Sequence, residues 1–198
     1  LVQLYKAQGD HGDIESRLET IVNDYERTTV SAEGYYQLGR IYTSEKWELE
    51  KAREYFEMVS KESSRSIFSP MAKNYVKAIE LYQTAVKDLE LHLKVNDSEK
   101  ALDMVEIPDS SQEAIPKEVR PDRTEPELYY QLADLEAFTF DRYEQSIVYL
   151  NKIIEEYLET PFRTKSLFAL VFVHEALGDT ASSENIKDQI LTDFPESD

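Results

Sequence analysis

The sequence predicts an all-α protein, and three observations support this class. Glycine and proline are few, with 5 and 7 among 198 residues, so little interrupts helix formation. Apolar residues recur at spacings of three and four, which is the period of a helix. The phrase YYQLGRIY, which begins at Tyr35, returns 94 residues later as YYQLADLE, which begins at Tyr129. The chain therefore contains a repeated helical unit.

Composition limits the classes of partner. The chain holds 40 acidic and 22 basic residues and a net charge of −18, which repels phosphate backbones and anionic membrane surfaces, so we expect no nucleic-acid partner. A hydrophobic content of 41% is sufficient for a sizeable core. No cysteine is present, which excludes disulfides and thiolate zinc sites but fits any compartment. No run of about 18 apolar residues occurs, so we expect no direct membrane insertion.

The clearest copy of the unit spans residues 31–66. Ser31 is the expected N-cap of a first helix, and a second helix is expected from about Glu48 to Lys61. The expected buried side chains of the two helices are Tyr35, Leu38, Ile41, Tyr42, Ala52, Tyr55, Phe56 and Val59. Trp47 falls in the turn, where we expect it to cap the interhelical core rather than contact a ligand.

Two further copies follow near the C-terminus. The copy at 127–161 keeps Tyr129, Leu132 and Ala133 in its first helix, with Ser146, Leu150 and Ile153 in its second. The copy at 162–198 has Leu167, Leu170 and Val171, followed by Ile186 and Ile190. Residues 1–30 are interpreted as a partial repeat, because IVNDYERT resembles ILTDFPES. We predict hairpins near 1–29, 31–63, 126–158 and 162–193.

Residues 67–126 are interpreted as a degenerate repeat followed by a loop. An apolar row from Met71 to Leu93 predicts one long inserted helix near 70–95, with Pro70 at its start. DSEKALDMVE then resembles a reduced second helix. Four of the seven prolines lie in the next stretch, IPDSSQEAIPKEVRPDRTEP, which predicts an extended loop. A domain boundary at this loop is the alternative.

The unit at 31–66 resembles the tetratricopeptide repeat (TPR). The TPR signature is W-x2-L-G-x2-Y, then A-x3-F, then P. Leu38, Gly39 and Tyr42 match it, as do Ala52 and Phe56, whereas Tyr35 replaces the tryptophan and Ser64 stands at the proline position. The resemblance implies a TPR-like solenoid, a right-handed superhelical array of antiparallel helix hairpins. Small residues at the Gly39 and Ala52 positions let the paired helices approach closely.

The last seventy or so residues also resemble a group of bacterial envelope proteins with TPR-like repeats. EEYLETPFRTKSLFAL and LTDFPES are similar to recurring phrases of outer-membrane assembly lipoproteins and of periplasmic partners of the Tol-Pal system. The resemblance implies a periplasmic or outer-membrane-associated location, with the cytoplasm as the alternative. Because the sequence begins without methionine and apparently inside a helix, we expect a part of a larger chain or complex.

No pattern of catalytic, metal or cofactor residues emerges. His11, His92 and His174 are far apart in sequence, and no HExxH pair occurs. Glu155 and Glu156 are adjacent on a helix and point to different faces, so they do not form an acid–base pair. DSSQEAIPKE lacks the ligand spacing and glycine of a calcium loop. We therefore expect no enzyme activity, no metal and no cofactor.

The predicted function is a protein-interaction scaffold. In a TPR-like array the first helices line a concave face, which binds protein or peptide segments. Transfer of the groove positions predicts contacts from Glu33, Tyr36, Arg40, Thr43, Glu127, Tyr130, Asp134, Lys165, Phe168 and Phe172. The alternative is an architectural spacer or capping module of a larger protein, without a free groove. For each aromatic residue, packing against the next helix is the structural alternative.

The proline-rich loop adds one more expectation. It carries Ile107, Ile115 and Val119 among acids, prolines and serines, as a groove ligand would. We expect residues near 105–122 to lie against the array and compete with an external partner. A disordered loop is the alternative.

Overall fold

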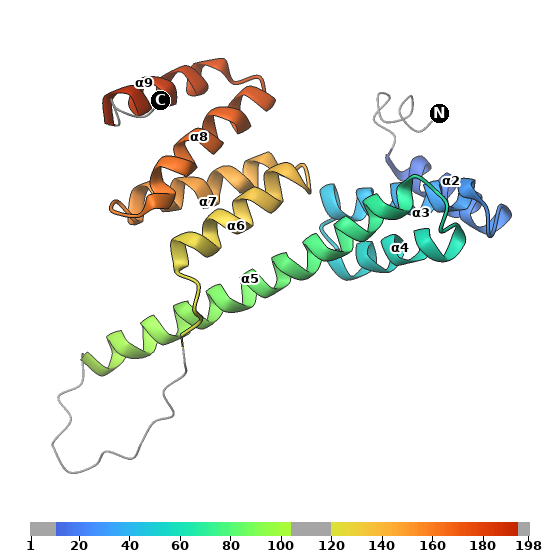
Figure 1. Cartoon of the computed structure of the whole chain (residues 1–198), viewed down its shortest axis with the longest axis horizontal. Coiled ribbons are helices and arrows are strands. Elements are labelled where there is room, and N and C mark those ends of the chain that lie inside the picture. The colour runs from blue at the N-terminus through green and yellow to red at the C-terminus, as the bar shows by residue number, and fades with distance from the viewer. Residues whose placement is uncertain (1–10, 104–119, 194–198) are drawn as a thin grey trace, which may run out of the picture. The chain divides into compact units, whose positions relative to one another are not determined.

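The structure, a computed structural model, describes residues 11–103 and 120–193. These residues form eight α-helices and no strand, which confirms the predicted all-α class. The helices are α2 (His11–Asp24), α3 (Thr29–Ser44), α4 (Leu49–Glu62), α5 (Phe68–Asp103), α6 (Glu125–Phe138), α7 (Tyr143–Glu156), α8 (Pro161–Ala176) and α9 (Thr180–Asp193) (Figure 1). Residues 1–10 of the expected first hairpin and residues 105–119 of the expected groove ligand lie outside the described residues.

The described chain divides into two compact units. The first contains residues 11–81 together with the short segment Thr139–Asp141, and the second contains residues 82–103, 120–138 and 142–193. Both units are built from helices that contact their neighbours in chain order. In the first, α2 packs on α3 and α3 on α4. In the second, α6 packs on α7, α7 on α8 and α8 on α9.

The start of α3 differs from the prediction. Thr28, not Ser31, is the N-cap, and the two residues form a capping box in which each side-chain oxygen accepts the other's backbone N–H at 3.2 Å. The Ser31 hydroxyl is buried and donates to Glu62 of α4 at 2.7 Å. The capping box therefore begins α3 and, through Ser31, also ties this helix to α4.

Removal of the cap gives a first prediction. Thr28→Ala should lower the free energy of unfolding of the first unit by about 1 kcal/mol, because it leaves an N-terminal N–H of α3 without an acceptor. Denaturation followed by the fluorescence of Trp47, which lies in this unit, measures the effect. Thr29→Ala, one residue further along at an exposed position, is the control and should change little. Equal effects of the two substitutions would contradict the prediction.

The repeated phrase folds into the same hairpin twice. Helices α6 and α7 end and begin at Phe138 and Tyr143, each 94 residues after the corresponding positions Ser44 and Leu49. The two turns also match. Trp47 and Asp141 both adopt a positive φ, 55° and 57°, and in both turns the next backbone N–H donates to a carbonyl six residues earlier, at 3.0 and 2.8 Å.

Close packing inside each hairpin pairs a small residue on the first helix with a large residue on the second. In the first unit, Gly39 lies against the ring of the fully buried Phe56, so near that an added Cβ would lie 2.6 Å from a ring carbon. The corresponding pair in the second unit is Ala133 and Leu150, both buried. A larger residue on the second helix is accompanied by a smaller residue on the first. The predicted close approach at Gly39 is therefore present in the structure.

The long helix is longer than predicted. Helix α5 spans Phe68–Asp103, whereas the apolar row indicated a helix near 70–95. Residues 97–103, expected as the start of a separate reduced helix, continue α5 instead. Its apolar row is also less uniform than expected, because Ile79 is buried while Met71 and Leu93 are exposed.

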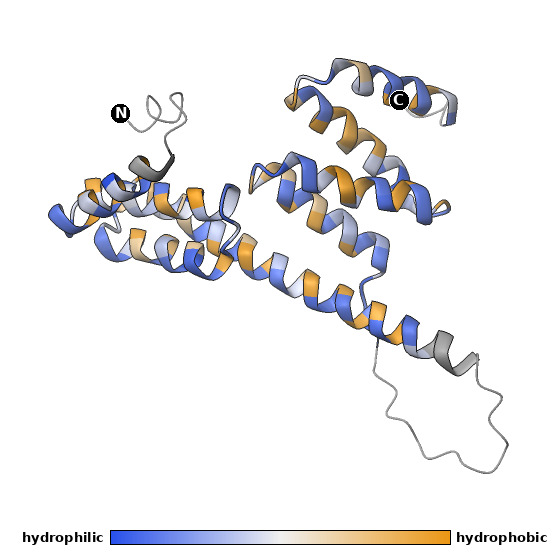
Figure 2. Ribbon diagram, turned by 180° about the vertical axis from the view of Figure 1, so that it is seen from behind, coloured by the Kyte–Doolittle hydropathy of each residue, from blue (hydrophilic) through white to orange (hydrophobic). Residues whose placement is uncertain are grey.

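The core of the second unit joins the two C-terminal hairpins. Ala133, Ala137, Leu150, Leu170 and Val173 form a buried cluster. In Figure 2 much of α8 carries the colour of hydrophobic residues, in agreement with its position between α7 and α9. No helix formed by the described ranges is both long enough and apolar enough to cross a bilayer.

Candidate protein-binding surface

The first unit covers most of its own predicted contact residues. Tyr36 is only 4% exposed, and its ring centroid lies 4.9 Å from that of Phe68, at the start of α5. Thr43 is fully buried, and its hydroxyl donates to the carbonyl oxygens of Gly39 and Arg40 at 3.2 and 3.0 Å. Tyr36 and Thr43 are therefore core residues in this structure, and neither is available to a partner at the surface.

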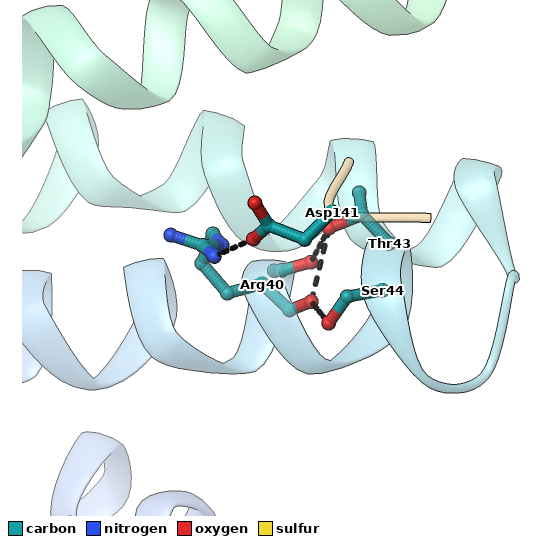
Figure 3. Close-up of polar contacts among 5 residues, drawn as sticks. Arg40, Thr43, Ser44 and Asp141 are labelled. Carbon is teal, nitrogen blue, oxygen red and sulfur yellow. Dashed lines mark hydrogen bonds and ion pairs between the residues drawn. The ribbon is translucent and has the colours of Figure 1, made fainter. Parts of the chain in front are cut away.

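Arg40 of the same unit is half-buried and already paired. Figure 3 shows its guanidinium pointing toward the carboxylate of Asp141, with which it forms an ion pair. The guanidinium carbon also lies 5.6 Å from the ring centroid of Tyr75, in a cation–π contact. Burial raises the pKa of Tyr75 to about 12, so its phenol stays neutral at physiological pH. Of the four α3 residues predicted to contact a partner, Glu33 is the exposed one.

The second unit leaves its predicted contact residues accessible. Phe168 and Phe172 of α8 are 49% and 50% exposed, and Phe138 at the end of α6 is 49% exposed. Glu127 and Tyr130 are half-buried, and Asp134 and Lys165 are exposed. We call the surface formed by Glu127, Tyr130, Asp134, Phe138, Phe162, Lys165, Phe168 and Phe172 the α6–α8 surface.

Two ring contacts fix the direction of the helices that form the α6–α8 surface. Tyr130, near the start of α6, lies 5.6 Å from Phe162, near the start of α8, between ring centroids. Phe138, at the end of α6, lies 4.9 Å from Phe172 near the end of α8. The two helices therefore run in parallel, side by side, with their Cα atoms approaching within 8 Å.

A hollow of about 820 Å³ opens at one end of the α6–α8 surface. It is formed by the start of α6, the end of α7 and the start of α8. Six of its lining residues are Pro126, Glu127, Tyr157, Leu158, Pro161 and Phe162. Glu127 and Phe162 belong to both the hollow and the α6–α8 surface, so the two features are continuous.

The α6–α8 surface carries charged side chains of both signs. The ammonium of Lys165 lies 4.9 Å from the ring centroid of Phe162, which is one of the aromatic rings of the surface. Desolvation raises the pKa of Asp134. The pKa of Tyr130 is also raised, mainly by desolvation and to a smaller extent by the negative charge of Asp134. The side chain of Asp134 is exposed, so its neighbours desolvate only part of the carboxylate.

Two aromatic residues of this surface were missed by the sequence interpretation. Phe138 follows Asp134 by four residues and lies on the same stripe of α6 as Tyr130 and Asp134, so helical spacing could have identified it. Phe162 follows the helix-starting Pro161, and its role depends on the contact with Tyr130. That contact joins two helices and has no local signal in the sequence.

A buried polar cluster also lies in the second unit. Glu136 of α6 is fully buried, and the hydroxyl of Tyr82 on α5 donates to its Oε1 at 2.8 Å. Nε of Arg142 lies 2.8 Å from Oε2 of the same carboxylate. Desolvation raises the pKa of Glu136, and the bonds to Tyr82 and Arg142 oppose this shift. The cluster joins α5, α6 and the start of α7 through the contacts of one carboxylate.

The described residues hold no group of three side chains arranged to ligate a metal. Nε2 of His92 lies 2.7 Å from the carbonyl oxygen of Arg123, and Nδ1 of His174 lies 3.1 Å from a carboxylate oxygen of Asp179. Each of these imidazoles is engaged by one nearby group of the protein itself.

No family model, curated protein or solved structure matches this chain in comparisons of sequence and fold.

Proposed function

We propose that the chain is a non-catalytic protein-interaction module that binds a protein segment on the α6–α8 surface. The observation that carries the proposal is the row of half-exposed aromatic rings, Phe138, Phe168 and Phe172, on helices that also border the hollow. Contiguous exposed apolar surface beside a polar rim is typical of interaction sites. Aromatic side chains are also among the residues that contribute most to binding at interfaces.

Covering these rings with a partner is energetically favourable. Covering a fully exposed large apolar side chain gains about 1.5–3 kcal/mol, so three half-exposed rings together offer a few kcal/mol when a partner covers them. Those rings stay near water in the structure because α7 and α9 pack on other faces of α6 and α8. A partner with apolar side chains would remove this surface from water.

The proposal includes a TPR-like solenoid, in which first helices of successive hairpins line one face. The support is the repeated hairpin, the packing of helices in chain order and the parallel course of α6 and α8. In such an array, α6 and α8 are the first helices of adjacent units. A role in bacterial envelope assembly is proposed from the resemblance of the C-terminal phrases, and localisation of the tagged full-length protein tests it.

The first unit favours a second role, that of an architectural module. Tyr36 and Thr43 are buried and Arg40 is paired with Asp141, so the corresponding face of α3 is occupied by residues of the unit itself. We propose that this unit supports the array, whereas the second unit binds the partner.

The test uses the whole chain and a random library of displayed twelve-residue peptides. Peptides enriched on the wild-type chain should lose about tenfold or more in affinity for Phe138→Ala/Phe172→Ala, because the rings that contact them are removed. Tyr25→Ala and Val148→Ala remove exposed apolar side chains elsewhere and should leave affinity unchanged. Circular dichroism checks that all variants fold.

Two outcomes would contradict the proposal. The first is a library that yields no peptide whose affinity depends on Phe138 and Phe172. The second is an equal loss of affinity in the control variants and in Phe138→Ala/Phe172→Ala.

A further inference from the structure

The α6–α8 surface carries an ordered pattern along α6. Tyr130, Asp134 and Phe138 are spaced by four residues each, so they lie on one stripe of the helix. At a rise of 1.5 Å per residue, the first and last are about 12 Å apart along the axis, with the carboxylate midway. Each aromatic member is paired with a ring from α8, Phe162 or Phe172. The surface therefore presents aromatic, acidic and aromatic positions in a row.

Asp134 is the acidic centre of this row. Among the described residues it forms no hydrogen bond or ion pair, and its surroundings raise its pKa. Tyr130 on its own helix faces it, and Lys165 on α8 is directed over the ring of Phe162. A basic side chain placed beside Asp134 would gain an ion pair, and a partner that covers the neighbouring rings would exclude water and strengthen that pair.

Charge also favours a basic partner. The chain has a net charge of −18, which attracts basic segments at long range and opposes association with a second copy of itself. Glu127, Glu156 and Glu159 line the adjacent hollow, so the approach to the site is acidic. Electrostatic attraction of this kind increases the association rate and is reduced by salt.

The spacing along α6 fits an extended segment. The Cα atoms of α6 and α8 approach within 8 Å, so the two helices are in contact beside the ring pairs. In an extended chain, alternate side chains point the same way and residues advance about 3.3 Å each. Side chains at i, i+2 and i+4 therefore span about 13 Å on one face, close to the distance from Tyr130 to Phe138.

We propose that the α6–α8 surface recognises an extended protein segment with the pattern apolar-x-basic-x-apolar, in which Asp134 pairs with the basic side chain. This inference rests on the proposed function and specifies its ligand. The two apolar side chains cover the ring pairs Tyr130/Phe162 and Phe138/Phe172, and the basic side chain reaches Asp134 between them. Asp134 is thus the residue that determines specificity, while the rings provide apolar contact.

The probes are synthetic peptides with phenylalanine, lysine and phenylalanine at alternate positions in a glycine–serine background, and versions with glutamine or glutamate at the centre. The lysine peptide should bind the wild-type chain about tenfold more tightly than the glutamate peptide, and less tightly as salt is added. Asp134→Asn should remove this preference, and Asp134→Lys should reverse it. Asp188→Asn changes the net charge equally at an exposed site on α9 and should leave the preference intact.

The outcomes separate this inference from the proposed function. Equal affinity for the lysine and glutamate peptides, or equal behaviour of Asp134→Asn and Asp188→Asn, would overturn the inference. If Phe138→Ala/Phe172→Ala then still weakens every peptide, the proposed function remains. If that double variant changes nothing, the proposed function fails as well. Absence of binding of the lysine peptide at about 1 mM, a weak affinity by any standard, would also overturn the inference.

Discussion

Gly39→Ala should destabilise the first unit by about 1–3 kcal/mol, and Gly39→Leu by at least as much. The added Cβ would lie 2.6–2.8 Å from three ring carbons of Phe56, which is 1% exposed. A ring enclosed in a core cannot move away freely, so the helices or the ring must shift. Denaturation followed by Trp47 fluorescence measures the loss. An unchanged transition for Gly39→Leu would show that α3 and α4 do not meet here.

The second hairpin supplies the matched control for this prediction. There the same two positions hold Ala133 and Leu150. Phe56→Leu should therefore cost stability in the wild-type background but restore part of the loss in Gly39→Ala, because it makes room for the methyl group. A double-mutant cycle should give a favourable coupling energy of about 1 kcal/mol or more. Additive effects of the two substitutions would show that the sizes of the residues at positions 39 and 56 are not coupled.

Glu136→Ala should have the largest effect in the second unit, a loss of about 3–5 kcal/mol. The substitution leaves the hydroxyl of Tyr82 and the guanidinium of Arg142 without the carboxylate that both contact at 2.8 Å, and it opens space in the core. Most of this cost comes from the buried Tyr82 hydroxyl that loses its acceptor and from the space left in the core, because the side chain of Arg142 is 24% exposed and stays partly hydrated.

Chemical denaturation followed by circular dichroism measures this loss. Glu155→Ala, at an exposed position of α7, is the control and should change stability by less than about 0.5 kcal/mol. Tyr82→Phe should cost less than Glu136→Ala and should be non-additive with it, since both remove the same hydrogen bond. Equal stability of Glu136→Ala and Glu155→Ala would show that the carboxylate is not buried in solution.

Sequence alone was sufficient for the helices and for much of the packing within a hairpin. Helical spacing, few glycines and prolines and the 94-residue repeat located α3, α4, α6, α7, α8 and α9 to within a few residues. The close approach of the two helices at Gly39 was predicted from the repeat pattern, whereas its partner there, the ring of Phe56, was identified only by the structure. These features depend on hydrogen bonds and contacts between residues close in the chain, whose preferences the sequence displays directly.

Tertiary structure alone decided which faces of the helices stay open. Tyr36 and Thr43 occupy the same predicted face as Tyr130 and Phe172, yet the first two are buried and the last two are at least partly accessible. The rings of Phe68 and Tyr75 on α5 pack against Tyr36, and no local pattern predicts that contact. Glu136 likewise is a charged residue of a type usually found at the surface. It is buried here, where Tyr82 and Arg142 supply its partners. Burial depends on which distant segment covers a side chain, and a helical period describes only the side chain's direction.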